Sequence, residues 1–182
     1  GIYVDQVLHI DTDASPEFIG ATDVWADLGG QDRAGENVIV GVLDTGIWPE
    51  HPSYSDPDPS GKPYGPHPGG GTYDCNFGNT AWNPNDAPFT CNNKLIGAYE
   101  FMDTYKAVVG LDANEFDSAR DSDGHGSHTS STAAGNAGVA ASIMGADLGI
   151  VSGIAPRAKI IMYRVCGGPT GSCYSSDSAA AV

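Results

Sequence analysis

Residues 38–43 (Val-Ile-Val-Gly-Val-Leu) form a continuous apolar run that leads directly into Asp44-Thr45-Gly46. A run of this length and composition is typical of a parallel strand that is buried on both faces. Asp44 then lies at the carboxyl end of the strand, where open α/β sheets form their ligand crevices. The same three residues can also be a simple strand-to-turn connection, because Asp and Gly favour turns.

A second segment, Asp123-Gly124-His125-Gly126-Ser127-His128, predicts the start of a helix that ends near Gly135-Asn136. Its remaining residues are nearly all Ser, Thr and Ala, which give a weak helix propensity but allow close packing. We therefore expect a buried helix that is stabilised by tertiary contacts. His125 taken alone is compatible with a purely structural histidine.

His125 and His128 are three positions apart and so share one helix face. Two histidines at this spacing can bind a metal, which leaves open a zinc site or a metallohydrolase that also uses nearby Asp residues. No third or fourth ligand is evident at a suitable spacing. The more economical interpretation pairs His125 with Asp44, because a histidine base needs a carboxylate on its other ring nitrogen to activate a serine.

In this order, the two segments resemble the Asp and His segments of the subtilisin-like serine proteases, the subtilases. Four further segments are similar to the cucumisin-like, plant-type branch of that family: 46–54, 91–98, 153–160 and 162–166. The match is collinear over nearly all of residues 15–180. The resemblance implies an α/β fold with a subtilisin-like parallel sheet flanked by helices, of which this chain is the N-terminal portion.

The resemblance also implies a domain organisation. Residues 13–182 are expected to be the N-terminal portion of the catalytic domain, with a loop insertion at about 52–93. Residues 1–12 are expected to be either a propeptide remnant or an N-terminal arm. Short elements are predicted by local pattern: a helix over 21–28, strands over 94–101 and 158–165, a loop or hairpin over 142–152, and a helix from residue 175.

By this resemblance Asp44 orients His125, and His125 is the general base of a secreted serine endopeptidase. No Gly-Thr-Ser-Met-Ala-type segment occurs up to Val182, so the nucleophilic Ser and the oxyanion Asn are expected downstream. Tyr174 resembles part of the substrate-lining strand. The expected partners are a peptide or protein substrate and an inhibitory propeptide. The alternative is a catalytically inert fragment or a binding chain on the same scaffold.

The four cysteines form two local pairs in turn-rich segments, at positions that resemble those of the cucumisin-like enzymes. The expected disulfides are Cys75–Cys91 and Cys166–Cys173, which imply an oxidising compartment, outside the cell or in a periplasm. The paired knuckles of a four-cysteine zinc site are missing. No signal peptide is recognisable at the start, which favours a chain that is either cytosolic or already processed.

The net charge of −15 argues against nucleic-acid or anionic-membrane partners, and no apolar stretch reaches the length of about 20 residues that a membrane helix needs. The chemistry requires no cofactor. Ser53 replaces the Asp that forms the strong calcium site of many subtilisins, so that site is expected to be absent. Calcium elsewhere remains possible, because acidic residues are clustered, although most are expected to be solvated: Asp56, Asp58, Asp112, Asp117, Asp121 and Asp123.

Overall fold

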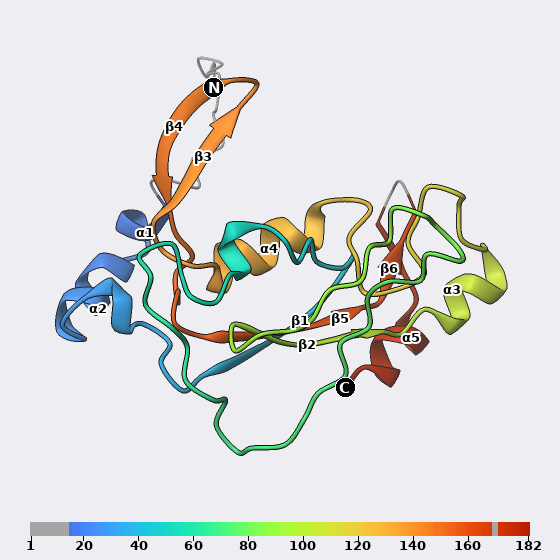
Figure 1. Cartoon of the computed structure of the whole chain (residues 1–182), viewed down its shortest axis with the longest axis horizontal. Coiled ribbons are helices and arrows are strands. Elements are labelled where there is room, and N and C mark those ends of the chain that lie inside the picture. Colours follow the sequence, from blue (N-terminus) through green and yellow to red (C-terminus); the bar gives the residue numbers. More distant parts are fainter. Residues whose placement is uncertain (1–14, 169–170) are drawn as a thin grey trace, which may run out of the picture.

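A three-stranded parallel sheet lies at the centre of the computed structural model, which describes residues 15–168 and 171–182 (Figure 1). Its strands are β1 (Ile39–Asp44), β5 (Lys159–Arg164) and β2 (Leu95–Glu100), in the order β1-β5-β2. Both pairings are parallel, and Asp44 stands opposite Arg164 at the carboxyl ends. The predicted parallel α/β fold is confirmed.

Helices flank this sheet at its face and at both ends. Helix α4 (His125–Ala134) packs on β1 and β5. At one end of the molecule lie α1 (Ser15–Phe18), α2 (Ala21–Asp27) and the 3-10 turn η1 (Gln31–Arg33). At the other end α3 (Asp103–Val108), which the sequence analysis did not predict, contacts α5 (Ser175–Ala180) (Figure 1).

The buried core lies between the sheet and α4, and its members come from strands, loops and helix alike: Ile47, Tyr54, Leu95, Ala134, Ala158, Ile160 and Met162. Strand β5 is buried along almost its whole length because it is the central strand. The expectation that 38–43 is buried on both faces is wrong. Within the described sheet β1 is an edge strand, and its Leu43 is 39% exposed.

Helix α4 is also less buried than expected. Only one side of it, formed by Gly126, Ser130 and Ala134, is buried against the sheet. These positions are four residues apart, so they form one stripe along the helix. The remaining side chains, including His125, stay partly or fully exposed. The small residues therefore allow close contact on one face and leave the opposite face open.

The insertion at 52–93 contains one short regular element, the 3-10 turn η2 (Pro52–Tyr54), and an isolated bridge between Cys75 and Ala98. It is more than a surface loop, because several of its side chains are buried: Ser53, Tyr54, Tyr64, Asn83 and Asp86. Asp86, for example, accepts hydrogen bonds from Gly78 N, Asn79 N and Ser118 Oγ. Side-chain contacts of this kind anchor an irregular backbone.

Two small antiparallel pairs complete the described chain. Strands β3 (Val139–Ile143) and β4 (Ala146–Val151) form a hairpin that projects from the body (Figure 1). Strands β6 (Cys166–Gly167) and β7 (Ser172–Cys173) form a short ribbon closed by a disulfide. The segment 1–12, predicted to be a propeptide remnant or arm, lies outside the described residues.

Candidate active site

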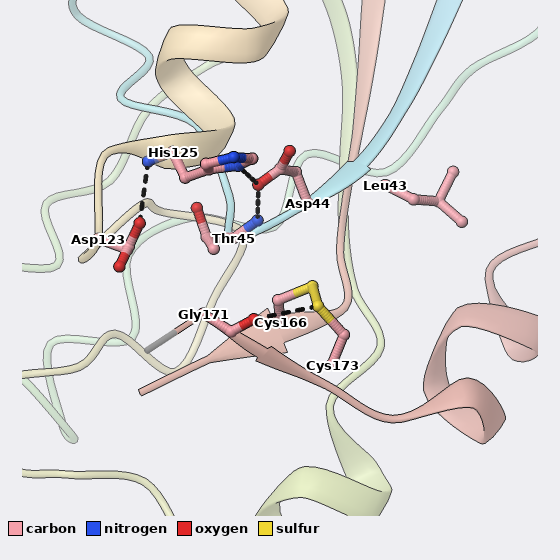
Figure 2. Close-up of a pocket in the computed structure, with 8 residues that line it drawn as sticks. All are labelled: Leu43, Asp44, Thr45, Asp123, His125, Cys166, Gly171 and Cys173. Atoms are coloured by element: carbon pink, nitrogen blue, oxygen red, sulfur yellow. Dashed lines mark hydrogen bonds and ion pairs between the residues drawn. A yellow bond between two sulfur atoms is a disulfide. The ribbon is translucent and has the colours of Figure 1, made fainter. Parts of the chain in front are cut away.

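Asp44, the last residue of β1, and His125, the first residue of α4, meet above the carboxyl end of the sheet. Asp44 Oδ1 lies 2.8 Å from His125 Nδ1, although the residues are 81 positions apart (Figure 2). The carboxylate is held on both sides, because Thr45 N donates to Oδ1 at 2.7 Å and Thr129 Oγ1 donates to Oδ2 at 2.9 Å. The carboxylate orientation is therefore set before any ligand binds.

The two partners differ in exposure, since the His125 side chain is 65% exposed and that of Asp44 only 13%. The hydrogen bond to Asp44 and the charge of that carboxylate raise the pKa of His125 above 6.5. A neutral imidazole that donates to Asp44 carries its proton on Nδ1, which leaves the Nε2 lone pair available. No partner for Nε2 is found among residues 15–168 and 171–182. The pair thus presents a base to the solvent.

Two glycines permit the close approach of the two segments. A Cβ atom on Gly126 would overlap the carbonyl oxygen of Gly46, and one on Gly46 would lie 2.7 Å from Ala119 O. Gly46 also has a φ of +119°, which side chains rarely adopt. The first turn of α4 therefore lies directly against the backbone that follows Asp44.

Hydrogen bonds join these segments, residues 44–48 and 119–129, which we call the Asp–His junction. Thr45 Oγ1 accepts from Gly126 N at 2.8 Å and donates to Asp121 Oδ1 at 3.0 Å. Ser127 Oγ accepts from Trp48 N at 2.9 Å. Backbone bonds between Ile47 and both Ala119 and Asp121 complete the connection.

A cavity of about 520 Å³ opens beside the pair and is lined by Leu43, Asp44, Thr45, Asp123, His125, Cys166, Gly171 and Cys173 (Figure 2). The disulfide-closed ribbon β6–β7 forms the wall opposite the imidazole. Glu115 anchors that ribbon, because its Oε1 accepts from Gly168 N at 2.8 Å and pairs with the buried Arg164 at 3.2 Å. One wall of the cavity is therefore formed by the junction, and the opposite wall is formed by the β6–β7 ribbon that Glu115 holds in place.

Tyr174 and His128 lie away from this pair. Tyr174 is absent from the lining of the cavity and packs edge-on against Tyr105, with ring centroids 6.5 Å apart. Its role in substrate binding stays a prediction. His128 lines a second cavity of about 400 Å³ that also contacts His51 and Trp25. The structure thus separates His128 from the Asp44–His125 pair.

Both disulfides are formed as paired in the sequence analysis, Cys75–Cys91 within the insertion and Cys166–Cys173 at the cavity wall. Within the described part of the chain no group of three or more His, Cys, Asp and Glu side chains is placed to hold a metal ion. The expectation that most of the clustered acids are solvated is wrong, because Asp121 is buried and Asp56, Asp58 and Asp117 are half-buried, whereas only Asp112 and Asp123 among the six are exposed.

Three residues of the site were not identified from the sequence as its members: Thr45, Thr129 and Asp121. Thr129 follows His125 by four positions and therefore lies on the same helix face. That spacing is a signal that could have identified it. The contacts of Thr45 with Asp121 and with Gly126 cross 76 and 81 positions, and no local pattern reports them. Asp121 also accepts from Asp123 N and Gly124 N, so an Asp followed by a turn before the helix is a local signal that could have identified it.

A sequence model of the Subtilase family matches residues 35–182. The chain is 43% identical over 155 residues to Subtilisin-like protease SBT2.6 of Arabidopsis thaliana, covering 84% of this chain and 18% of that protein. It is 42% identical over 176 residues to Subtilisin-like protease SBT1.7 of the same plant, covering 96% and 22% respectively. The chain belongs to the subtilase family, in its plant-type branch.

The chain spans about a fifth of the length of these relatives. Among the residues that the structure describes, no helix combines the length and the apolar character that crossing a membrane requires.

Proposed function

We propose that these residues are the N-terminal portion of the catalytic domain of a secreted serine endopeptidase. In this proposal Asp44 and His125 are two members of an Asp/His/Ser triad, and polypeptide beyond Val182 supplies the serine and the oxyanion Asn. The observation that carries the proposal is the 2.8 Å contact between Asp44 Oδ1 and His125 Nδ1, beside an open cavity. Two disulfides support an oxidising, extracytoplasmic location.

The chemistry follows from the geometry of the pair. His125 Nε2 takes the proton of the serine hydroxyl as its oxygen attacks the peptide carbonyl, and later gives that proton to the leaving amine. The resulting imidazolium is stabilised by the Asp44 carboxylate, which keeps its own charge throughout. The bonds from Thr45 and Thr129 hold that carboxylate in place during both steps. All these groups are side chains or backbone, so the proposal requires no cofactor.

The substrate class is a peptide or protein segment, which would lie in the cavity between His125 and the β6–β7 ribbon. The same cavity would receive an inhibitory propeptide, because a propeptide is itself a peptide chain that occupies the substrate position. Nothing in the strongly acidic composition favours a nucleic-acid ligand.

A fluorophosphonate probe tests the proposal on the whole protein that carries these residues. We expect covalent labelling of a serine outside them, and loss of labelling in Asp44→Asn and His125→Ala variants that keep the wild-type circular dichroism spectrum. A folded wild-type protein that takes no label and cleaves no peptide would overturn the proposal in favour of an inert fragment or binding chain on a subtilase scaffold.

A further inference from the structure

We propose that Asp121 is the positioning residue of the Asp44–His125 pair, which it never touches, and that its carboxylate sets the approach of the imidazole to Asp44. The inference rests on the proposed function. Asp121 is 5% exposed and lies in the turn before α4. Its place at the centre of the Asp–His junction is defined by the groups that donate to it.

Five donors converge on this one carboxylate. Oδ1 accepts from Thr45 Oγ1 at 3.0 Å, Asp123 N at 3.0 Å and Gly124 N at 2.8 Å. Oδ2 accepts from Ser127 N at 2.9 Å and Ser127 Oγ at 2.7 Å. An ionised carboxylate accepts at both oxygens and can therefore bond to all five donors. A protonated acid or an amide would instead place its own hydrogen against one of these donors.

The ionised form is the one that the surroundings favour. Burial by itself opposes ionisation of Asp121, but the hydrogen bonds from Gly124, Ser127 and Asp123 outweigh it and lower the pKa of the carboxyl group. A fixed negative charge therefore lies beneath the first turn of α4.

Asp121 links both halves of the pair through one residue each. Thr45, which follows Asp44, donates to Asp121 and accepts from Gly126 N, the group that follows His125. Ser127 donates to Asp121 and accepts from Trp48 N. The backbones that carry Asp44 and His125 are thus tied to the same two carboxylate oxygens. If either oxygen can no longer accept these hydrogen bonds, the backbones that carry Asp44 and His125 are held together less firmly.

The experiment compares Asp121→Asn with Asp86→Asn in the whole protein. Asp86 is a control for burial, because it is fully buried and accepts from two backbone N–H groups, a serine and the side chain of Arg120 in the junction, but from none of the residues that donate to Asp121. The readouts are the rate of fluorophosphonate labelling across pH, kcat and KM on a peptide substrate, and thermal unfolding.

For Asp121→Asn we expect kcat to fall by about 10²-fold, the scale of a displacement near 1 Å, with KM within about threefold. We also expect the acid limb of the labelling profile to move to lower pH, because the contact with Asp44 and the nearby charge of Asp121 both raise the pKa of His125. Thr45→Val keeps the Asp121 charge and therefore isolates the contribution of the contact. Asp86→Asn should lower thermal stability and leave the acid limb in place.

An unchanged acid limb in a folded Asp121→Asn variant would overturn the inference, as would an equal displacement in Asp86→Asn. Should Asp121→Asn fail to fold, Thr45→Val removes only the hydroxyl that joins Asp121 to Gly126 N. A displacement of the acid limb in the same direction is expected there, and its absence contradicts the proposal. A wild-type protein that takes no label overturns the proposed function itself, and the positioning role with it.

Discussion

The Asp–His junction and the β3–β4 hairpin differ in the contacts that hold them in place. The junction is largely irregular, yet its polar groups bond across more than 70 positions of sequence. The hairpin is a continuous antiparallel ladder with one register shift between Ala141 and Ser142, yet every residue of β4 is exposed, and Ile150 is 68% exposed. Regular secondary structure therefore does not show which segments of this molecule are held firmly in place. Long-range polar contacts show it better.

The largest contrast is expected between two carboxylates, Asp44 in the junction and Asp147 in the hairpin. Asp44→Asn leaves His125 in the wrong tautomer, because an amide nitrogen faces Nδ1, and should slow fluorophosphonate labelling by about 10⁴-fold. Asp147 accepts only from Gly149 N within the hairpin, so Asp147→Asn should label at the wild-type rate. Similar labelling rates for the two variants would show that the junction is no more important for reactivity than the hairpin.

Two glycines provide the next comparison. Gly126→Ala forces a methyl group onto the Gly46 carbonyl oxygen, and overpacking of this kind costs about 1–3 kcal/mol or more. Gly145→Ala at the hairpin tip meets no atom within 4 Å and suffers only from its φ of +83°, a penalty of about 1 kcal/mol. Denaturant unfolding measures both. A smaller loss of unfolding free energy for Gly126→Ala than for Gly145→Ala would contradict the close approach of Gly126 to Gly46.

The pH dependence of labelling sharpens the description of the junction. The folded pKa of His125 is raised by Asp44, and only neutral His125 is a base, so reactivity should be complete at high pH. It should fall as pH drops through that raised value, by about tenfold per unit below it. A midpoint at or below the ordinary histidine pKa would show that Asp44 does not act on His125 in solution.

A smaller effect is expected at Thr129, whose hydroxyl donates to Asp44 Oδ2. Thr129→Val keeps the shape and removes one hydrogen bond to a charged group, worth about 1.5–3 kcal/mol in such settings, of which only part is felt at the transition state. We expect labelling about fivefold slower. Thr132→Val, less than one turn further along α4 and at the second cavity, is the control and should label normally.

The smallest effect is expected in the hairpin. Leu148→Ser and Ile150→Ser change exposed side chains and should alter the free energy of unfolding by no more than about 0.5 kcal/mol. Thermal and denaturant unfolding of the whole protein measure it. A loss above about 2 kcal/mol would show that the hairpin packs against further polypeptide, and the contrast with the junction would fail.

Much of the fold could be predicted from local patterns. The apolar runs at 38–43 and 158–165 became β1 and β5, and the Asp-Gly-His sequence became the start of α4. Burial was predicted less well, because an apolar strand does not reveal whether it is central or at an edge. Helix α3 was missed, since its six residues Asp103–Val108 show no helical period and take their place through Asp177, which accepts from Thr104 N and Tyr105 N.

For the candidate site, the sequence identified Asp44 and His125, and only the structure gives the distance between them. Asp121 was grouped with other acids as a solvated or calcium-binding residue, because composition alone does not separate a buried acceptor from an exposed one. Its five donors come from four residues, of which three are local and Thr45 is distant. Only the folded chain brings that hydroxyl to it.

The Cys75–Cys91 bridge determines whether the protein stays in one covalent piece after a single cut in its chain. Exposed residues of the insertion, such as Thr80, Ala81 and Trp82, lie between the two cysteines. A cut there leaves both pieces covalently joined, so the nicked protein keeps its mass until it is reduced. The exposed glycines 69–71 lie outside the bridge, and a cut there frees the preceding polypeptide. On a non-reducing gel, a cut between the two cysteines therefore leaves the band unchanged, whereas a cut at residues 69–71 produces two smaller fragments.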